Sequence, residues 1–185
     1  MGDPRSKMYP LMGSPLPFVS IFTFYIVFNF KIGPAIMNKR EPLKIRELVM
    51  SYNLLQIVSN TMIFIFGITL LPRVSIWCTP LDTSANSPFV TAHYLYLILK
   101  VFDLVDTNRK QITVLHVYHH VLMALGTWVL FMNIPGGQVF FVGFPNCFVH
   151  IIMYTYYFLI SWDPKYKKRI RWKKRITQLQ IEISE

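Results

Sequence analysis

ITVLHVYHHVLMALGTWVLFM, the sequence of residues 112–132, combines a long apolar run with three of the five histidines of the chain. The run is long enough to cross a bilayer core, which needs about 20 apolar residues in a helix. On a helix His116, His119 and His120 share one face, because they are three and four residues apart. Imidazole can act near neutral pH as a base, a nucleophile or a metal ligand. The stretch therefore predicts a membrane-spanning helix whose histidine patch lines a cavity where chemistry takes place.

The composition of the whole chain is that of a membrane protein. Hydrophobic residues make up 53% of it and charged residues only 15%, whereas soluble domains carry about 25% charged residues. Long apolar runs predict a polytopic all-α fold with five transmembrane helices. These spans are expected at residues 16–37, 48–71, 89–106, 112–132 and 138–162.

The distribution of basic residues predicts the topology. Lysine and arginine are frequent in the 38–47 loop, in the 108–110 turn and after residue 162, whereas the loops 72–88 and 133–137 carry little charge. By the positive-inside rule, the N-terminus is lumenal and the basic C-terminal segment is cytosolic. The net charge of +10 is therefore interpreted as membrane topology and contact with anionic lipid, not as nucleic-acid binding.

The third predicted span carries polar residues that lipid would not favour. Lys100, Asp103, Asp106 and Thr107 follow one another at spacings that keep them on one helical face. A charge at the bilayer centre costs about 2.5–3.5 kcal/mol, so such residues usually face a cavity and mark function. Two structural alternatives stay open. Lys100 and Asp103 can form a structural ion pair, or the polar residues can lie at the cytosolic end of the span and reach water.

The fifth predicted span carries a second polar stripe. Asn146 and His150 are four residues apart, and Met153, Tyr154 and Tyr157 continue the stripe. A lone histidine in a membrane helix often makes a helix–helix hydrogen bond, and Met153 and the tyrosines can serve packing alone. Because the preceding span carries its own histidine patch, a functional role for His150 is the stronger interpretation.

Two kinds of chemistry fit these histidines. A single metal ion can be held by His116, by His119 or His120, and by His150, but no carboxylate is placed to orient these ligands. Di-iron membrane oxidases use more histidines than the five present here, and the zinc motif HExxH needs a glutamate that this box lacks. Alternatively, an imidazole can accept an acyl group from a thioester, if a second group moves protons and water is excluded. The residues favour acyl transfer over a metal site.

Four motifs, in the family's order, make the chain resemble the ELO-type very-long-chain fatty acid elongases. Residues 100–107, KVFDLVDT, are similar to the family's KxxExxDT, and residues 111–120, QITVLHVYHH, to its QxxxLHxxHH box. Residues 146–157, NCFVHIIMYTYY, match NxxxHxxMYxYY, and residues 177–180, TQLQ, are similar to its TxxQ element. Further segments, WCTPLD at residues 77–82 and YPLM at residues 9–12, resemble insect members most.

The resemblance implies a seven-helix elongase fold, in which a six-helix barrel encloses an acyl tunnel in the endoplasmic reticulum membrane. It implies a 3-ketoacyl-CoA synthase, which condenses a long-chain acyl-CoA with malonyl-CoA and releases CO2 and CoA. No cofactor and no metal is implied beside these two substrates. The expected partners are the lipid bilayer, other elongases in homo- or hetero-oligomers, and the reductases and dehydratase of the elongation cycle.

The resemblance also implies roles for individual residues. His119 is expected to be the acyl-accepting nucleophile, His150 its partner in proton transfer or thioester polarisation, and Asn146 the residue that orients His150. His116 and His120 are expected to hold the shape and hydrogen bonding of the site. The residues expected to bind substrate or CoA are Lys100, Asp103, Asp106, Thr107, Arg109, Lys110, Gln111, Met153, Tyr154, Tyr157 and Gln180.

Two departures from the family pattern bear on activity. Asp103 stands where the family has glutamate, and its shorter side chain is expected to displace the carboxylate. The last two spans of the family have no counterpart before Glu185, so residues 1–185 are expected to form a single ELO-type domain without them, with a tunnel that admits water. The alternative function is therefore a catalytically inactive, truncated elongase that acts through helix association with intact elongases.

Overall fold

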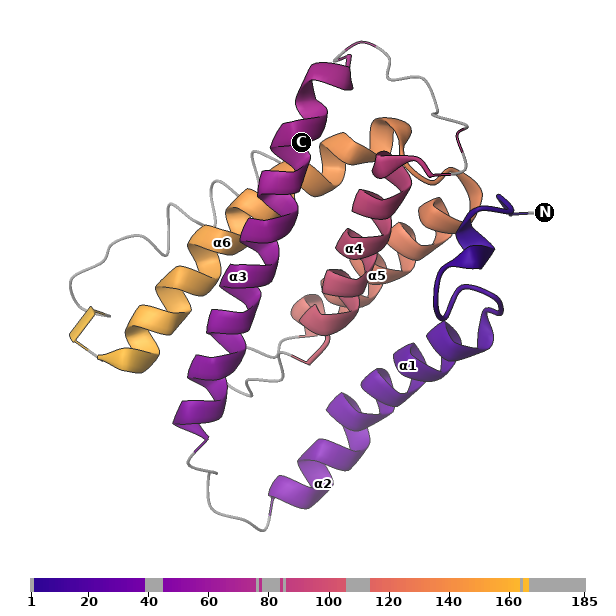
Figure 1. Ribbon diagram of the computed structural model, residues 1–185. Helices are drawn as coiled ribbons and strands as arrows, with labels where there is room; N and C mark the ends of the chain where they lie inside the picture. The colour runs from indigo at the N-terminus through magenta and orange to yellow at the C-terminus, as the bar shows by residue number, and fades with distance from the viewer. Residues whose placement is uncertain are drawn as a thin grey trace. The chain divides into compact units, whose positions relative to one another are not determined.

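The computed structural model of the protein describes residues 2–38, 45–75, 77, 84, 86–105, 114–163 and 165–166, with the backbone alone at residues 37 and 114–116. Within these ranges the chain is helical and contains no strand, which confirms the all-α prediction. The chain divides into two compact units. The first consists of Met1–Leu43 and Pro80–Val139, and the second of Lys44–Thr79 and Phe140–Glu185. Figure 1 shows the helices of both units.

The first unit is built on two helices that pack along each other and on an N-terminal helix. Its elements are η1 (Ser6–Met8), α1 (Leu16–Val27), the π-helical turn η2 (Phe28–Ile32), α2 (Gly33–Met37), α4 (Pro88–Asp103), α5 (Val114–Asn133) and η4 (Gly137–Val139). Pro88 opens α4 at a position where a helix needs no backbone N–H donor.

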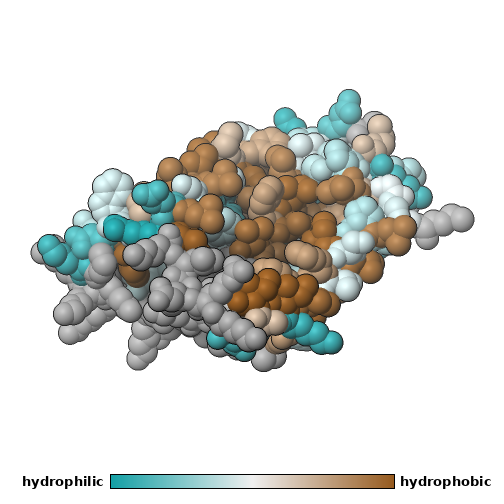
Figure 2. Space-filling view, turned by 90° about the horizontal axis from the view of Figure 1, so that it is seen from below, coloured by the Kyte–Doolittle hydropathy of each residue, from teal (hydrophilic) through white to brown (hydrophobic). Residues whose placement is uncertain are grey.

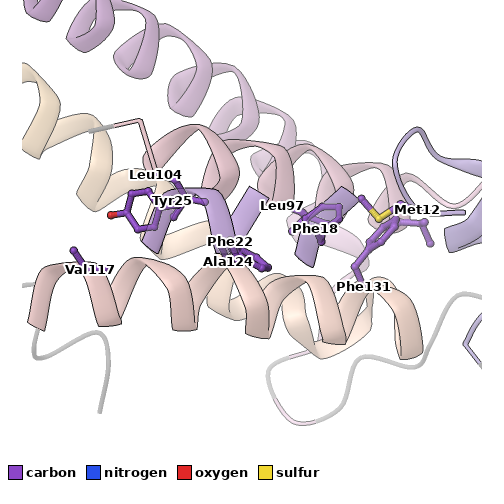
Figure 3. Close-up of a cluster of buried hydrophobic side chains, with 10 residues drawn as sticks. Met12, Phe18, Phe22, Tyr25, Leu97, Leu104, Val117, Ala124 and Phe131 are labelled. Carbon is purple, nitrogen blue, oxygen red and sulfur yellow. The ribbon is translucent and has the colours of Figure 1, made fainter. Parts of the chain in front are cut away.

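The core of the first unit fixes which face of α5 is buried. Buried side chains from the N-terminal segment, α1, α4 and α5 form this core (Figure 3), and Phe18 of α1 stacks on Trp128 of α5 with ring centroids 5.4 Å apart. Val117, Ala124 and Phe131 of α5 are buried in it. These three residues recur every seven positions and therefore mark one face of the helix. His119, two residues after Val117, lies off this face and is exposed.

The N-terminal segment is anchored to the end of α5. The backbone N–H of Asp3 donates to the carbonyl of Met132 at 2.8 Å, and the ring of Tyr9 lies 5.5 Å from that of Phe131. Arg5 forms an ion pair with Asp3 at 2.8 Å. Its guanidinium holds the pKa of the Asp3 carboxyl below its ordinary value, chiefly through a hydrogen bond. The anchor ties the segment that bears the YPLM motif to the first unit.

His93 links α4 to the turn after α5. The backbone N–H of Gly136 donates to Nδ1 of His93 at 3.2 Å. Gly136 has a φ of 86°, and a Cβ there would lie 3.0 Å from the Cβ of Phe89, so only glycine fits this close approach without strain. The ring of His93 also packs edge-on against Phe131, 5.2 Å away. These contacts give His93 a structural place in the fold.

The second unit contains an antiparallel helix pair. Its elements are α3 (Arg46–Leu70), η3 (Leu71–Arg73) and α6 (Phe140–Trp162), and α3 and α6 lie side by side in Figure 1. Three contacts set the register of the pair. Arg46 donates to the carbonyl oxygens of Ser161, at 2.7 Å, and of Trp162. The rings of Tyr52 and Tyr154 are 6.0 Å apart, and those of Phe64 and Phe144 are stacked at 4.7 Å.

Among the described residues, three helical segments are long and apolar enough to cross a membrane: Leu16–Ile36, Arg46–Arg73 and Gly137–Trp162. They correspond to the first, second and fifth predicted spans. The third and fourth predicted spans correspond to α4 and α5, and their passage through a membrane stays a prediction.

Large apolar side chains are exposed on the candidate spans. Phe24 of α1 and Met62 and Ile65 of α3 each expose more than half of their surface. Figure 2 shows apolar residues over much of one face of the molecule. Exposed apolar surface of this extent marks contact with lipid or another apolar partner, in agreement with a membrane-embedded chain.

Two helical glycines are expected to respond in opposite ways to alanine. A Cβ at Gly67 of α3 would lie 2.6 Å from Cδ2 of Phe144, and stacking on Phe64 and Phe140 holds that ring in place. Gly67→Ala should therefore lower the free energy of unfolding by about 1–3 kcal/mol. Nothing lies within 4 Å of a Cβ at Gly126 of α5, so Gly126→Ala should raise it by about 0.5–1 kcal/mol. Unfolding in detergent micelles measures both, and a stabilising Gly67→Ala would contradict the packing of α3 on α6.

Candidate active site

The histidine box lies on the first helical turns of α5, in the first unit. The rings of His119 and His120 are perpendicular, with centroids 5.7 Å apart. His119 is exposed and His120 half-buried, because the face of α5 marked by Val117 and Ala124 is the one that packs into the core. The backbone of His116 is helical, one turn earlier. Among the described residues, the imidazole of His119 is therefore exposed where a substrate can approach it.

The polar face of α4 ends in a buried ion pair. Nζ of Lys100 lies 2.8 Å from Oδ2 of Asp103, with 4% and 1% of the two side chains exposed. Lys100 also lies over the ring of Tyr96, 5.0 Å from its centroid, in a cation–π arrangement. The structural ion pair left open by the sequence is therefore present. Although Asp103 is shorter than the glutamate of the family pattern, its carboxylate reaches Lys100.

Several predicted site residues lie outside the part of the chain that the structure describes. They are Asp106, Thr107, Arg109, Lys110, Gln111 and Gln180. Their roles stay predictions.

The second polar stripe lies on α6, in the second unit. His150 is 8% exposed and Tyr154 is completely buried, with their rings edge-on and 5.5 Å apart. Tyr157 packs against Tyr154 at 6.4 Å, while Asn146 and Met153 are half-buried on the same helix. The structure thus joins His150, Tyr154 and Tyr157 in one aromatic row inside this unit.

Sequence analysis missed a row of polar residues on α3. Asn53, Gln56 and Asn60 are 3%, 2% and 1% exposed. Nε2 of Gln56 donates to the hydroxyl oxygen of Tyr52 at 2.8 Å. Nδ2 of Asn60 donates to the backbone oxygen of Gln56 at 2.8 Å and to its Oε1 at 3.3 Å. The signal was the spacing of three and four residues between amides inside an apolar span, a pattern that puts them on one face.

The fold and these histidine-bearing helices define an all-α, multi-pass membrane protein. The chain belongs to the ELO family, described as the GNS1/SUR4 family, whose family model matches residues 10–182. It is 36% identical to a very long chain fatty acid elongase of Aedes aegypti, over 97% of this chain and 54% of that protein. It is also 36% identical to very long chain fatty acid elongase 1 of Mus musculus, over 97% and 68%. Very long chain fatty acid elongase 7 of Drosophila melanogaster is 35% identical, over 97% and 58%.

The chain spans between about half and about two thirds of the length of these curated relatives. The matched part contains both histidine-bearing helices. Chemically, it offers an exposed imidazole on α5 and a buried imidazole among tyrosines on α6. An accessible imidazole can act as a nucleophile or a base, whereas a buried one suits proton transfer at a site that excludes water.

Proposed function

We propose that this chain is a 3-ketoacyl-CoA synthase of fatty acid elongation, which condenses a long-chain acyl-CoA with malonyl-CoA. The observation that carries the proposal is the exposed imidazole of His119, on the α5 helix of a chain that belongs to the ELO family. The names of its relatives, very long chain fatty acid elongases, support a substrate of the long-chain acyl class. The two substrates suffice for the reaction, and no cofactor or metal is part of the proposal.

In the first step a ring nitrogen of His119 attacks the thioester carbonyl carbon. The nitrogen–carbon bond forms, the carbon–sulfur bond breaks, and CoA leaves as a thiolate that takes the proton lost by the imidazole ring, giving an acyl-imidazole. His150, oriented by Asn146, is proposed to move this proton or to polarise the thioester. Its burial beside Tyr154 supports a role at a site that excludes water.

In the second step malonyl-CoA loses CO2, and the electron pair of the broken carbon–carbon bond forms an enolate. The enolate carbon attacks the acyl carbon of the acyl-imidazole, and the nitrogen–acyl bond breaks. The released ring nitrogen takes a proton from water, which regenerates His119, and 3-ketoacyl-CoA leaves. His116 and His120 are proposed to hold the site's shape. Of the proposed substrate-binding residues, the basic ones suit the phosphates of CoA, and Met153 and Tyr157 suit its acyl chain.

The proposed setting of the reaction is the endoplasmic reticulum membrane, with a lumenal N-terminus and a cytosolic C-terminus. Lysine and arginine gather in the sequence after residue 162, and this asymmetry supports the orientation. Acyl-CoA and malonyl-CoA would then reach the basic side of the protein. Oligomers with other elongases and with the enzymes of the elongation cycle are part of the same proposal.

The test is the incorporation of labelled malonyl-CoA into a 3-ketoacyl product. Microsomes that contain the 185-residue chain are incubated with a long-chain acyl-CoA, beside microsomes without it and microsomes with the mouse relative. The expected result is incorporation above background that depends on the added acyl-CoA. If only the mouse relative incorporates label while the chain is present in equal amount, the proposal is contradicted for this chain.

A further inference from the structure

The amide row of α3 contains buried polar atoms that no other described residue satisfies. Nδ2 of Asn53 and Oδ1 of Asn60 are buried and have no hydrogen-bond partner among the described residues. One of these atoms is a donor and the other an acceptor. A buried polar group without a partner is costly, and more so in a helix that spans a membrane. Such a pair of atoms on α3 therefore points to a ligand that supplies the complementary groups.

Asn53 and Asn60 lie on the face of α3 that meets α6. They are seven residues apart, and the same spacing relates Asn53 to Arg46 and Asn60 to Gly67. Arg46 hydrogen-bonds the end of α6, and Gly67 lies against the ring of Phe144 of α6. The contacts at both ends of this face thus direct the two amides toward α6.

The register of the pair places His150 at the level of the amides. Tyr52 contacts Tyr154, and Phe64 contacts Phe144, so in an antiparallel pair His150 lies opposite the turn of α3 between Gln56 and Asn60. A continuous series of contacts connects the two helices. It runs from Asn60 through Gln56 and Tyr52 to Tyr154 and His150.

We propose that Asn53 and Asn60 bind the polar linker of the thioester substrate next to His150. The N–H of Asn53 donates to a carbonyl oxygen, and Oδ1 of Asn60 accepts from an amide N–H. A CoA thioester carries both groups in a flexible linker, and seven helical residues span about 10 Å, within the reach of that linker. Gln56 is a positioning residue, because it orients the amide of Asn60 and the hydroxyl of Tyr52. The proposal rests on the proposed function for the identity of the thioester.

The test measures binding without turnover. Hexadecyl-CoA, a thioether that cannot transfer its chain, is titrated into the full chain in detergent micelles while thermal unfolding is followed. Asn53→Leu and Asn60→Leu should raise its dissociation constant about 10- to 100-fold each, the effect of a lost hydrogen bond in a buried site. Ser51→Leu, a change from polar to apolar at an exposed position of the same helix, should bind like the wild type.

Stability without ligand separates binding from a structural role. Asn53→Leu removes a buried donor that has no partner among the described residues, so the melting temperature of the ligand-free variant should equal or exceed that of the wild type. The inference is overturned if the wild type does not bind the thioether, if both leucine variants bind it as the wild type does, or if Asn53→Leu lowers the ligand-free melting temperature. Asparagine-dependent binding by a wild type that incorporates no malonyl-CoA supports the inference and contradicts the proposed function. Incorporation of malonyl-CoA with a KM for acyl-CoA that is unchanged in both leucine variants supports the proposed function and contradicts the inference.

Discussion

His119→Ala is expected to lower kcat for malonyl-CoA condensation by at least about 10³-fold, the scale of loss when a nucleophile or its acid–base partner is removed. The exposed imidazole of His119 is the group that accepts the acyl chain in the proposed first step. Without it, the thioester carbonyl carbon of the acyl-CoA loses its proposed nucleophile. Binding of hexadecyl-CoA should persist in the variant, because the imidazole contributes to bond formation rather than to holding the linker.

An acyl adduct gives a second measurement of the same step. Acyl-CoA added without malonyl-CoA should raise the intact mass of the wild type by one acyl group in place of a proton, and His119→Ala should show no such increase. Tyr118→Phe is the matched control, because Tyr118 is the neighbouring residue of α5 and is 63% exposed. The control should form the adduct and turn over like the wild type. An adduct of normal yield in His119→Ala would assign the nucleophile to another histidine.

Periodicity and composition were sufficient to predict the class of fold. The apolar runs predicted helices, and three of the five expected spans coincide with helical segments that can cross a membrane. The spacing between Lys100 and Asp103 allowed the ion pair that the sequence left open, since residues three apart on a helix are neighbours. These features are local, so a sequence pattern determines them without knowledge of tertiary contacts.

Features that depend on contacts between distant segments could not be derived in the same way. The exposure of His119 follows from which face of α5 packs against α1 and α4, and helical spacing alone does not select that face. The amides of α3 could not be recognised as a site from the sequence for a related reason. Asn53 and Asn60 stand out only when burial and the register with α6 are known. Their spacing was visible, but spacing alone does not show which face of a helix is buried.

Asp103→Asn is expected to lower the free energy of unfolding by about 3–5 kcal/mol, because it removes the carboxylate that pairs with the buried charge of Lys100. The ammonium and the carboxylate lie 2.8 Å apart, and neither side chain has access to water. An amide at position 103 can accept a hydrogen bond but does not neutralise the lysine. Unfolding of the full chain in detergent micelles measures the change. Glu47→Gln, which removes an exposed charge on α3, should stay within about 0.5 kcal/mol of the wild type.

Replacing both partners of the ion pair separates its effect on stability from its effect on substrate binding. Lys100→Met with Asp103→Leu removes both buried charges and keeps comparable volume, so its stability should match or exceed that of the wild type. A double variant as unstable as Asp103→Asn would contradict this account of the ion pair. The double variant also tests the proposed role of Lys100 and Asp103 in substrate binding. Because the double variant stays folded, a change in its kinetics reports on substrate binding and not on stability. A raised KM for acyl-CoA would support contact between the pair and CoA, whereas an unchanged KM and kcat would leave the pair with a structural role alone.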